Sequence, residues 1–313
     1  MNPANPDDAF NSQLSRRRFL RHAAWAGAAV AVTVSGGVVT SKVLHHGSSA
    51  PTAEDFSFVQ ISDSHIGFTG AANPDVTRTF QSAIDLVNAL PAQPDFVVHT
   101  GDLTHFSTNE QFDQVKQMLS TLRTGQVVVL PGEHDSTDDA GQKYRQFFGA
   151  GTQGDGWFSF DHRGAHFVAL VNTINLQKLG HLGAEQLAWL EADLKRVSSE
   201  TPLVVFSHIP LFAMYPDWGW GTDDATTALS RMRRFGSVTV LNGHVHQLMT
   251  KVEGNITFHT AASTAYPQPD PGDGPAPGPL RVVPEQLLSS LGVRQVTFVQ
   301  KAGAPVIVDA QIT

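Results

Sequence analysis

Five short polar segments of the sequence hold the residue types that bind metal ions. Each is rich in aspartate, glutamate, histidine or glycine, and each directly follows an apolar run. The segments are Asp63-Ser64-His65, Gly101-Asp102, Pro131-Gly132-Glu133-His134-Asp135, Ser207-His208-Ile209-Pro210 and Asn242-Gly243-His244-Val245-His246. Imidazole together with carboxylate is the ligand set of zinc, iron and manganese. The sequence therefore predicts a site for such ions.

Composition limits what else the chain can do. Its 313 residues, 41% of them hydrophobic, can supply a large core and exclude wholesale disorder. The absence of cysteine excludes disulfide scaffolds, thiolate zinc sites, iron–sulfur clusters and cysteine nucleophiles, whereas histidine occurs 14 times. A net charge of −8 argues against a nucleic-acid-binding surface.

The spacing within the five segments adds to their residue types. In Asp63-x-His65 and His244-x-His246, alternation along an extended chain aims both side chains the same way. Alone, an Asp-x-His or Gly-Asp pair is usually an ordinary turn. Five such segments, each after a buried strand, can converge on one place, because ligand sites in α/β sheets lie beyond the carboxyl ends of strands.

The elements that position these segments alternate between strands and helices. Helical spacing and a capping box, Ser107-x-x-Glu110, predict helices at 76–90, 107–122, 141–149, about 187–197 and 226–235. Apolar runs predict strands at 56–62, 96–100, 127–130, 157–161, 166–171, 203–207 and 238–242. Hairpins are expected at 247–260 and 292–311, and an irregular loop at 267–279. We expect one α/β domain of mixed sheet with flanking helices.

The five segments in this order resemble the calcineurin-like metallophosphoesterases. The resemblance spans about residues 56–265, and Asn242–Gln247 and Thr260–Thr264 are most similar to the cyclic-nucleotide phosphodiesterase-like branch. It implies a four-layer α-β-β-α sandwich with two mixed β-sheets. It also implies two divalent or trivalent metal ions (Fe, Zn or Mn) that activate a hydroxide for attack on a phosphate ester.

The same resemblance assigns roles to individual residues. Asp63, His65 and His246 would hold the first metal, His208 and His244 the second, and Asp102 would bridge both. His134 would assist the leaving group as an acid, and Asp135 would orient His134.

Glu133 departs from the family pattern, which has asparagine there in Gly-Asn-His-Asp. Glutamate can ligate the second metal and favour a more highly charged ion. Its charge can instead weaken phosphate binding and change the metal pair or the substrate class. Both outcomes are open.

Two further residues are predicted to contact substrate. His105 follows Asp102 by three residues, with a surface or capping role as the alternative. Trp218 lies in the aromatic run Tyr215–Trp220 after His208, where it would stack a base or aromatic ester, with ordinary packing as the alternative. His99 is interpreted as a core residue, and a supporting contact near the site is considered for His259.

Residues 1–50 differ from the rest and are interpreted as a separate segment from a domain at 51–313. Ser15-Arg16-Arg17-Arg18-Phe19-Leu20-Arg21, followed by an apolar run, resembles the bacterial twin-arginine export signal. The alternative is a plain amphipathic or transmembrane helix, and cleavage versus N-terminal anchoring is open. Export predicts a periplasmic or extracellular location, the export machinery as a partner, and membrane association only through this segment.

The function expected from these observations is an exported metal-dependent phosphoesterase, with phosphodiesters favoured as its small phosphate-ester substrates. Two alternatives remain. One is a metal-binding sensor or partner module with weak hydrolytic activity, for which Glu133 is the reason. The other is a phosphomonoesterase, which the sequence does not separate from a phosphodiesterase.

Overall fold

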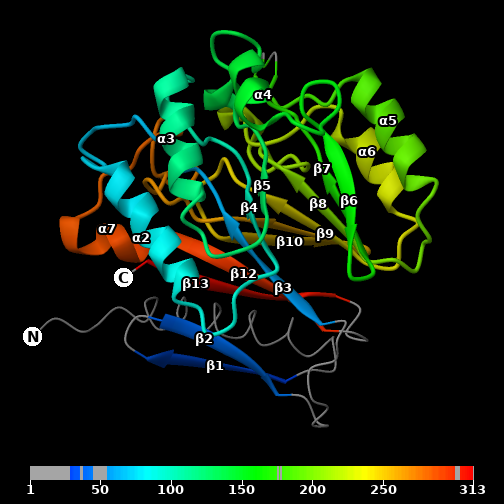
Figure 1. Ribbon diagram of the computed structural model, residues 1–313, viewed down its shortest axis with the longest axis horizontal. Coiled ribbons are helices and arrows are strands. Elements are labelled where there is room, and N and C mark those ends of the chain that lie inside the picture. The colour runs from blue at the N-terminus through cyan, green and yellow to red at the C-terminus, as the bar shows by residue number, and fades with distance from the viewer. Residues whose placement is uncertain are drawn as a thin grey trace, which may run out of the picture.

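Two β-sheets packed face to face form the centre of the molecule (Figure 1). The computed structural model describes residues 29–35, 38–44, 55–174, 176, 178–299 and 304–312. Between the sheets lies an aromatic-rich core in which Phe58, Phe96, Phe167 and Phe206 are buried.

The first sheet has the order β13-β12-β3-β4-β5. Its strands are β3 (Phe56–Ile61), β4 (Phe96–His99), β5 (Val127–Val129), β12 (Gly292–Phe298) and β13 (Val306–Gln311). The strands β3, β4 and β5 are parallel, whereas β12 pairs antiparallel with both β3 and β13. The sheet is therefore mixed, and its three parallel strands end at one edge.

The second sheet has the order β10-β11-β9-β8-β7-β6. Its strands are β6 (Phe158–His162), β7 (Ala165–Ala169), β8 (Leu203–Ser207), β9 (Val238–Asn242), β10 (Met249–Glu253) and β11 (Ile256–Thr260). The central strands β7, β8, β9 and β11 are parallel, and the edge strands β6 and β10 pair antiparallel with their neighbours. This sheet is also mixed.

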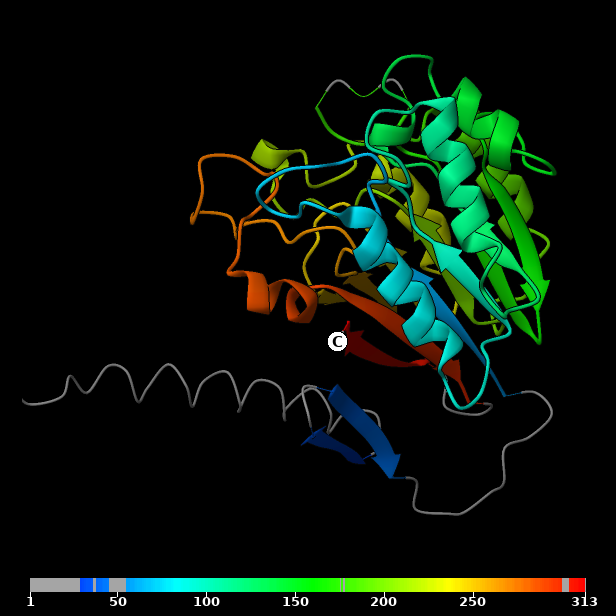
Figure 2. The same ribbon diagram turned by 60° about the vertical axis from the view of Figure 1, so that its left-hand side comes forward.

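Helices cover the outer face of each sheet (Figure 2). The helices α2 (Val76–Asn88), α3 (Asn109–Leu119), α4 (Gln142–Phe148) and α7 (Pro284–Ser290) pack on the first sheet. The helices α5 (Ala184–Leu194) and α6 (Ala225–Met232) pack on the second. Two short 3₁₀ turns, η1 (Glu133–Asp135) and η2 (Pro216–Trp218), lie in loops. The expected α/β fold with two mixed sheets is confirmed.

Most predicted elements are present, with two differences. The helix α3 is capped by Thr108, whose side chain accepts from the Gln111 N–H, so the predicted capping box at Ser107 is wrong. Ser107 adopts a left-handed φ of 54° and donates to the Asp135 carbonyl instead. The helix α7 was not predicted; Pro284 at its start fits the first helical turn.

The Ser15–Arg21 motif, which resembles an export signal, lies outside the described residues. Within the N-terminal region, the strands β1 (Ala29–Ser35) and β2 (Val38–Leu44) pair antiparallel. Among the residues described, none of the helices combines the length and the apolar character that crossing a membrane requires.

Candidate metal centre

The carboxyl ends of strands from both sheets carry all five polar segments. The loops after β3, β4 and β5 of the first sheet bring Asp63, Asp102 and Glu133, and those after β8 and β9 bring His208 and His244. Hydrogen bonds join these loops: Asp63 N–H donates to the Gly101 carbonyl, and His244 N–H donates to Asp63 Oδ1 at 3.0 Å. The two sheets therefore share one site.

One group of ligand atoms, which we call the first half-site, consists of Asp63, His65 and His246. His246 Nε2 lies 3.3 Å from Asp63 Oδ1 and 3.3 Å from His65 Nε2. His246 Nδ1 lies 2.7 Å from the Tyr266 carbonyl. Because a carbonyl only accepts, Nδ1 carries the proton and Nε2 keeps a lone pair for a metal.

The second half-site consists of Glu133, His208 and His244. The carboxylate of Glu133 lies 2.8 Å from His208 Nε2 and 2.8 Å from His244 Nδ1. His208 Nδ1 lies 2.7 Å from the Thr100 carbonyl, which fixes the ring and leaves Nε2 facing Glu133. Burial opposes protonation of His208, but Asp102 and Glu133 raise its pKa well above the ordinary value, so a metal ion would take the place of the Nε2 proton. Glu133 therefore lies among the candidate ligands of this half-site, and its role stays a prediction.

Asp102 lies between the half-sites. Its Oδ2 is 3.5 Å from His65 Nε2 and 3.4 Å from His208 Nε2. Its Oδ1 accepts the backbone N–H of His134 at 2.9 Å, which fixes the carboxylate. One carboxylate facing a histidine of each half-site is the arrangement that a bridging ligand requires.

The unpaired atoms of this site fit metal ions. Asp63 Oδ2, Glu133 Oε2, His208 Nε2 and both ring nitrogens of His244 are buried and lack hydrogen-bond geometry to any described partner. Buried polar atoms without partners are costly, and here they belong to groups whose ligand atoms lie within 4.8 Å of one another. Metal coordination would satisfy them, so the residues present fit two metal ions.

The charges of the site oppose the cost of burial. Burial disfavours ionisation of Asp63, yet His246 and His208 outweigh it and lower its pKa to about 2. Burial likewise opposes ionisation of Glu133, but His244 and His208 hold its pKa well below the ordinary value. Both carboxylates are therefore ionised and ready to bind a cation at neutral pH.

The backbone of the site is strained. Five of the residues that carry candidate ligands have a left-handed φ between 43° and 68°: Asp63, His65, Asp102, His244 and His246. This conformation is unfavourable for side chains with a Cβ, and such residues cluster at functional sites. The unfavourable backbone conformation therefore coincides with the residues whose side chains converge on the site.

His134 lines the pocket, but its support differs from the prediction. Its Nδ1 lies 2.9 Å from the His105 carbonyl, while Asp135 accepts from the backbone N–H groups of Gly132, Leu103 and Thr104 and from the Thr104 hydroxyl. Asp135 thus joins the loop after β4 to that after β5, and it supports His134 through the backbone. Burial and Asp102 raise the pKa of Asp135 to about 7.

The ring of His134 stacks on that of His105, with centroids 4.6 Å apart. Burial disfavours the charged form of His134, but Asp102 and Glu133 outweigh it and raise its pKa. His105 is half-buried, and burial together with His134 lowers its pKa to about 4. In this stacked pair, His134 therefore favours the protonated form and His105 favours the neutral form.

A pocket of about 290 Å³ opens over these side chains. Both predicted substrate residues, His105 and Trp218, line it. Trp220, from the aromatic run Tyr215–Trp220 that was considered for the site, lines it too. The sequence reasoning missed the other wall residues, which are Phe68, Tyr266, Gln268 and Pro277–Pro279. Tyr266 stacks on His65 with centroids 4.9 Å apart, and its position just after the Thr260–Thr264 run is the signal that could have indicated it.

Other histidines lie apart from the pocket. His99 is fully buried and its Nε2 lies 3.0 Å from Ser64 Oγ, and burial lowers its pKa to about 3. His259 pairs with Thr250 in the β10–β11 hairpin rather than with a site residue.

The geometry defines a two-sheet α/β protein with a candidate dimetal centre, and comparison with known proteins names the family. The sequence profile of the calcineurin-like phosphoesterases matches residues 56–248. The chain therefore belongs to the calcineurin-like phosphoesterases, a family of metal-dependent hydrolases.

Individual relatives are distant. The chain is 27% identical to a probable glycerophosphodiester phosphodiesterase, GpdQ, of Arcobacter nitrofigilis over 66% of this chain and 78% of that one. It is 24% identical to a 3′,5′-cyclic-nucleotide phosphodiesterase, alr5338, of a Nostoc species, over 67% and 79%. A dimetal phosphatase of Danio rerio shares the fold, with a TM-score of 0.58 and 15% identity over 82% of this chain and 99% of that one.

Proposed function

We propose that the protein is an exported phosphodiesterase that uses two metal ions. The observation that carries the dimetal proposal is the place of Asp102 Oδ2, at 3.5 and 3.4 Å from a histidine nitrogen of each half-site. The unpaired ligand atoms of the second half-site support it. Iron, zinc and manganese are the candidate ions, and the experiment described below compares them.

The walls of the pocket favour a diester over a monoester. Its described lining residues include aromatic and proline side chains and five histidines, but neither lysine nor arginine. Glu133 adds a negative charge beside the place where phosphate would lie. A diester carries one negative charge and a monoester up to two near neutral pH. With metal ions bound, a diester therefore needs less further positive charge from the walls, which suits a pocket that lacks lysine and arginine and contains Glu133.

Individual side chains have distinct tasks in the proposed reaction. When bound, the metal ions supply Lewis acidity for the phosphoryl oxygens and lower the pKa of water. His134, whose pKa is raised, gives a proton to the leaving oxygen. The His105 carbonyl holds its ring at Nδ1, which leaves Nε2 to donate. The aromatic walls orient the organic groups of the ester.

The test is hydrolysis of bis(p-nitrophenyl) phosphate by protein loaded in turn with each metal. We expect metal-dependent hydrolysis that falls by about 10²–10⁴-fold in His134→Ala, the range of general acid catalysis. Asp102→Ala should abolish both activity and binding of two ions. Failure of every metal-loaded sample to hydrolyse diesters or monoesters would favour the metal-binding sensor instead, and faster hydrolysis of p-nitrophenyl phosphate would favour a phosphomonoesterase.

Export is supported by the Ser15–Arg21 motif alone. Cell fractionation of the full chain in a bacterium with the twin-arginine route tests it, with Arg16→Lys and Arg17→Lys combined as the variant. We expect the wild-type chain outside the cytoplasm and the variant inside. Retention of the wild-type chain in the cytoplasm would contradict the proposal while leaving the enzymatic one intact.

A further inference from the structure

A second cavity lies beside the metal centre and has no role in the mechanism above. It has a volume of about 570 Å³, against about 290 Å³ for the pocket over the ligands. Residues of β12 and β13, in the first sheet, line one side of it. Residues from the segments that follow β9 and β11, in the second sheet, line the other side. A volume of this size suits an organic group of considerable length.

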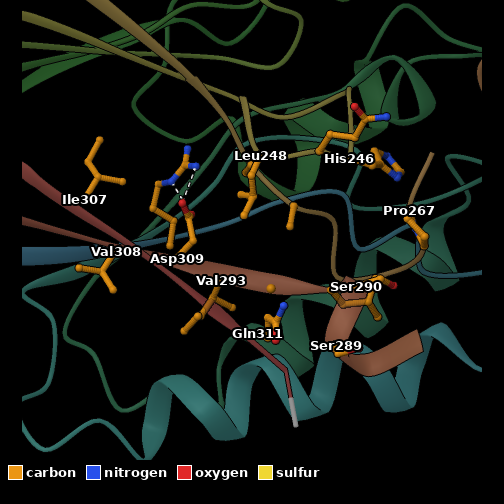
Figure 3. A pocket seen from close by; sticks show the side chains of 17 residues that line it. His246, Leu248, Pro267, Ser289, Ser290, Val293, Ile307, Val308, Asp309 and Gln311 are labelled. Atoms are coloured by element: carbon orange, nitrogen blue, oxygen red, sulfur yellow. Dashed lines mark hydrogen bonds and ion pairs between the residues drawn. The ribbon is translucent and has the colours of Figure 1, made fainter. Parts of the chain in front are cut away.

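The walls of this cavity are mainly hydrocarbon. Figure 3 shows Leu248, Val293 and Ile307 around the space, with Pro267 and Ser290 at the end near His246. Leu248 is 53% exposed, which is unusual for a large apolar side chain and places it at the mouth. Burying such surface is favourable by about 25 cal/mol per Å², so an apolar ligand would gain affinity here.

The charged side chains on the wall neutralise each other. Arg294 donates from Nε to Asp309 Oδ1 at 2.7 Å and from a terminal nitrogen to Asp309 Oδ2 at 3.1 Å, as the dashed lines in Figure 3 mark. The same guanidinium donates to the Thr260 carbonyl at 3.0 Å. Because the two charges of this pair offset each other, the cavity favours an uncharged group over an ion.

The cavity adjoins the pocket over the metal ligands. His246 lines both spaces. Pro267 lines the cavity, while its neighbours Tyr266 and Gln268 line the metal-site pocket. Gln247, which also lines the cavity, donates to the Gln268 and Pro269 carbonyls at 3.1 and 2.8 Å. Because the two spaces adjoin at His246 and along 266–268, an apolar arm in the cavity would lie next to a charged group at the metal centre.

We propose that the cavity binds the hydrocarbon arm of an amphipathic phosphodiester whose phosphate lies at the metal centre. This inference rests on the proposed phosphodiesterase function and names its substrate class. The metal-site pocket takes the phosphate and the leaving group, and the cavity takes the alkyl or acyl chain. Selectivity then comes from the length of that chain.

A series of p-nitrophenyl alkyl phosphodiesters, from methyl to octyl, tests the proposal on the metal-loaded full chain below micelle-forming concentrations. We expect kcat/KM to rise with chain length by up to roughly fourfold per methylene, the limit set by complete burial. An octyl-to-methyl ratio near one would overturn the inference while the phosphodiesterase function stood. Absence of hydrolysis of every ester in the series, and of bis(p-nitrophenyl) phosphate, would instead count against the function itself.

Two variants and a control place the effect in the cavity. Ile307→Trp fills the space from β13, and Leu248→Glu puts a charge at its mouth; each should reduce the octyl-to-methyl ratio at least tenfold. Val252→Glu is the matched control, because Val252 is 59% exposed on β10 and does not line the cavity. An octyl-to-methyl ratio that is unchanged in both cavity variants would contradict the placement of the alkyl chain in this cavity. An equal fall of the ratio in Val252→Glu would contradict it as well.

Binding of N-phenyl-1-naphthylamine, an uncharged apolar fluorophore, gives a readout that needs no hydrolysis. Its fluorescence should rise with wild-type protein and with Val252→Glu, and should be lost with Ile307→Trp. Equal binding to wild type and Ile307→Trp would show that the fluorophore lies elsewhere and would count against the cavity.

Discussion

Two clusters of buried histidine and carboxylate in this molecule differ in how their polar atoms are satisfied. In the second half-site, Glu133 lies 2.8 Å from a nitrogen of both His208 and His244, yet His208 Nε2 and both His244 nitrogens lack hydrogen-bond geometry. His166 of β7, by contrast, lies 2.7 Å from Asp161 and 2.9 Å from Asp193 through its two nitrogens. One cluster is incomplete without a ligand, and the other is complete within the protein.

The difference shows which chemical signal separates a site from a structural ion pair. Both clusters are rich in the residue types that bind metals, so residue type alone does not separate them. Asp193 also accepts from Ser159 and Arg196, so the surroundings of His166 are satisfied. Several buried ligand atoms without hydrogen-bond geometry in one cluster, rather than the number of histidines, mark the candidate ion site. A single such atom, as at His99 Nδ1, does not.

The largest expected effect comes from removing a ligand nitrogen. His208→Gln should lower kcat/KM about 10³-fold and reduce the metal content from two ions per chain to one, measured by elemental analysis. His166→Gln is the matched control, because it removes an equally buried imidazole that is already paired, and it should retain both ions. Loss of metal in His166→Gln would break the comparison.

Glu133→Gln keeps the shape of the side chain and removes its charge. Because the carboxylate faces both His208 and His244, we expect metal affinity of the second half-site to fall about 10–100-fold, the size typical of changes around a metal. Titration of apo-protein with the metal, followed by calorimetry, measures this. In Glu133→Asn, which restores the family residue, a gain in hydrolysis would instead show that Glu133 opposes catalysis.

His166→Gln should act on stability alone. The variant leaves Asp193 with Ser159 and Arg196 as partners, and Asp161 is largely exposed, so the expected loss is about 1–2 kcal/mol of unfolding free energy. Urea unfolding of wild type and variant, both metal-loaded, gives the difference. If the variant is as stable as the wild type, the ion pairs of His166 with Asp161 and Asp193 contribute nothing to the unfolding free energy.

The smallest expected effect is the pH dependence of that difference. Burial disfavours protonation of His166, but Asp193 and Asp161 outweigh it and raise its pKa above the ordinary 6.5. The stabilisation is therefore fully present below pH 6.5 and is lost as the pH rises through the higher folded-state pKa. Unfolding measured from pH 6 to 9 should show the gap between wild type and His166→Gln narrowing. A gap that widens would contradict the sign.

Sequence patterns predict the strands better than the surroundings of the site. The bounds of β8 and β9 agree with the prediction, because buried parallel strands are continuous apolar runs. The convergence of the five polar segments followed from their position after such strands. The tasks assigned to the ligands and to Asp135 stay predictions until they are tested by substitution.

Long-range contacts carry no comparable pattern. Asp135 bonds to Leu103 and Thr104, residues that lie about thirty positions earlier, and nothing in its local sequence specifies them. The proline-rich loop was predicted to be irregular, but its place on the pocket wall at Pro277–Pro279 depends on tertiary packing. The unsatisfied state of His208 and His244 is likewise visible only when all neighbours are known.

The left-handed backbone at the candidate ligands has a consequence for protein engineering. Each non-glycine residue in that conformation costs roughly 1–2 kcal/mol, and five ligand positions adopt it. Glycine at His65 or His244 would relieve this cost and remove a ligand at once. A catalytically dead scaffold made in this way should melt at a higher temperature than metal-free wild type, so selection for thermostability alone would tend to erase the enzyme.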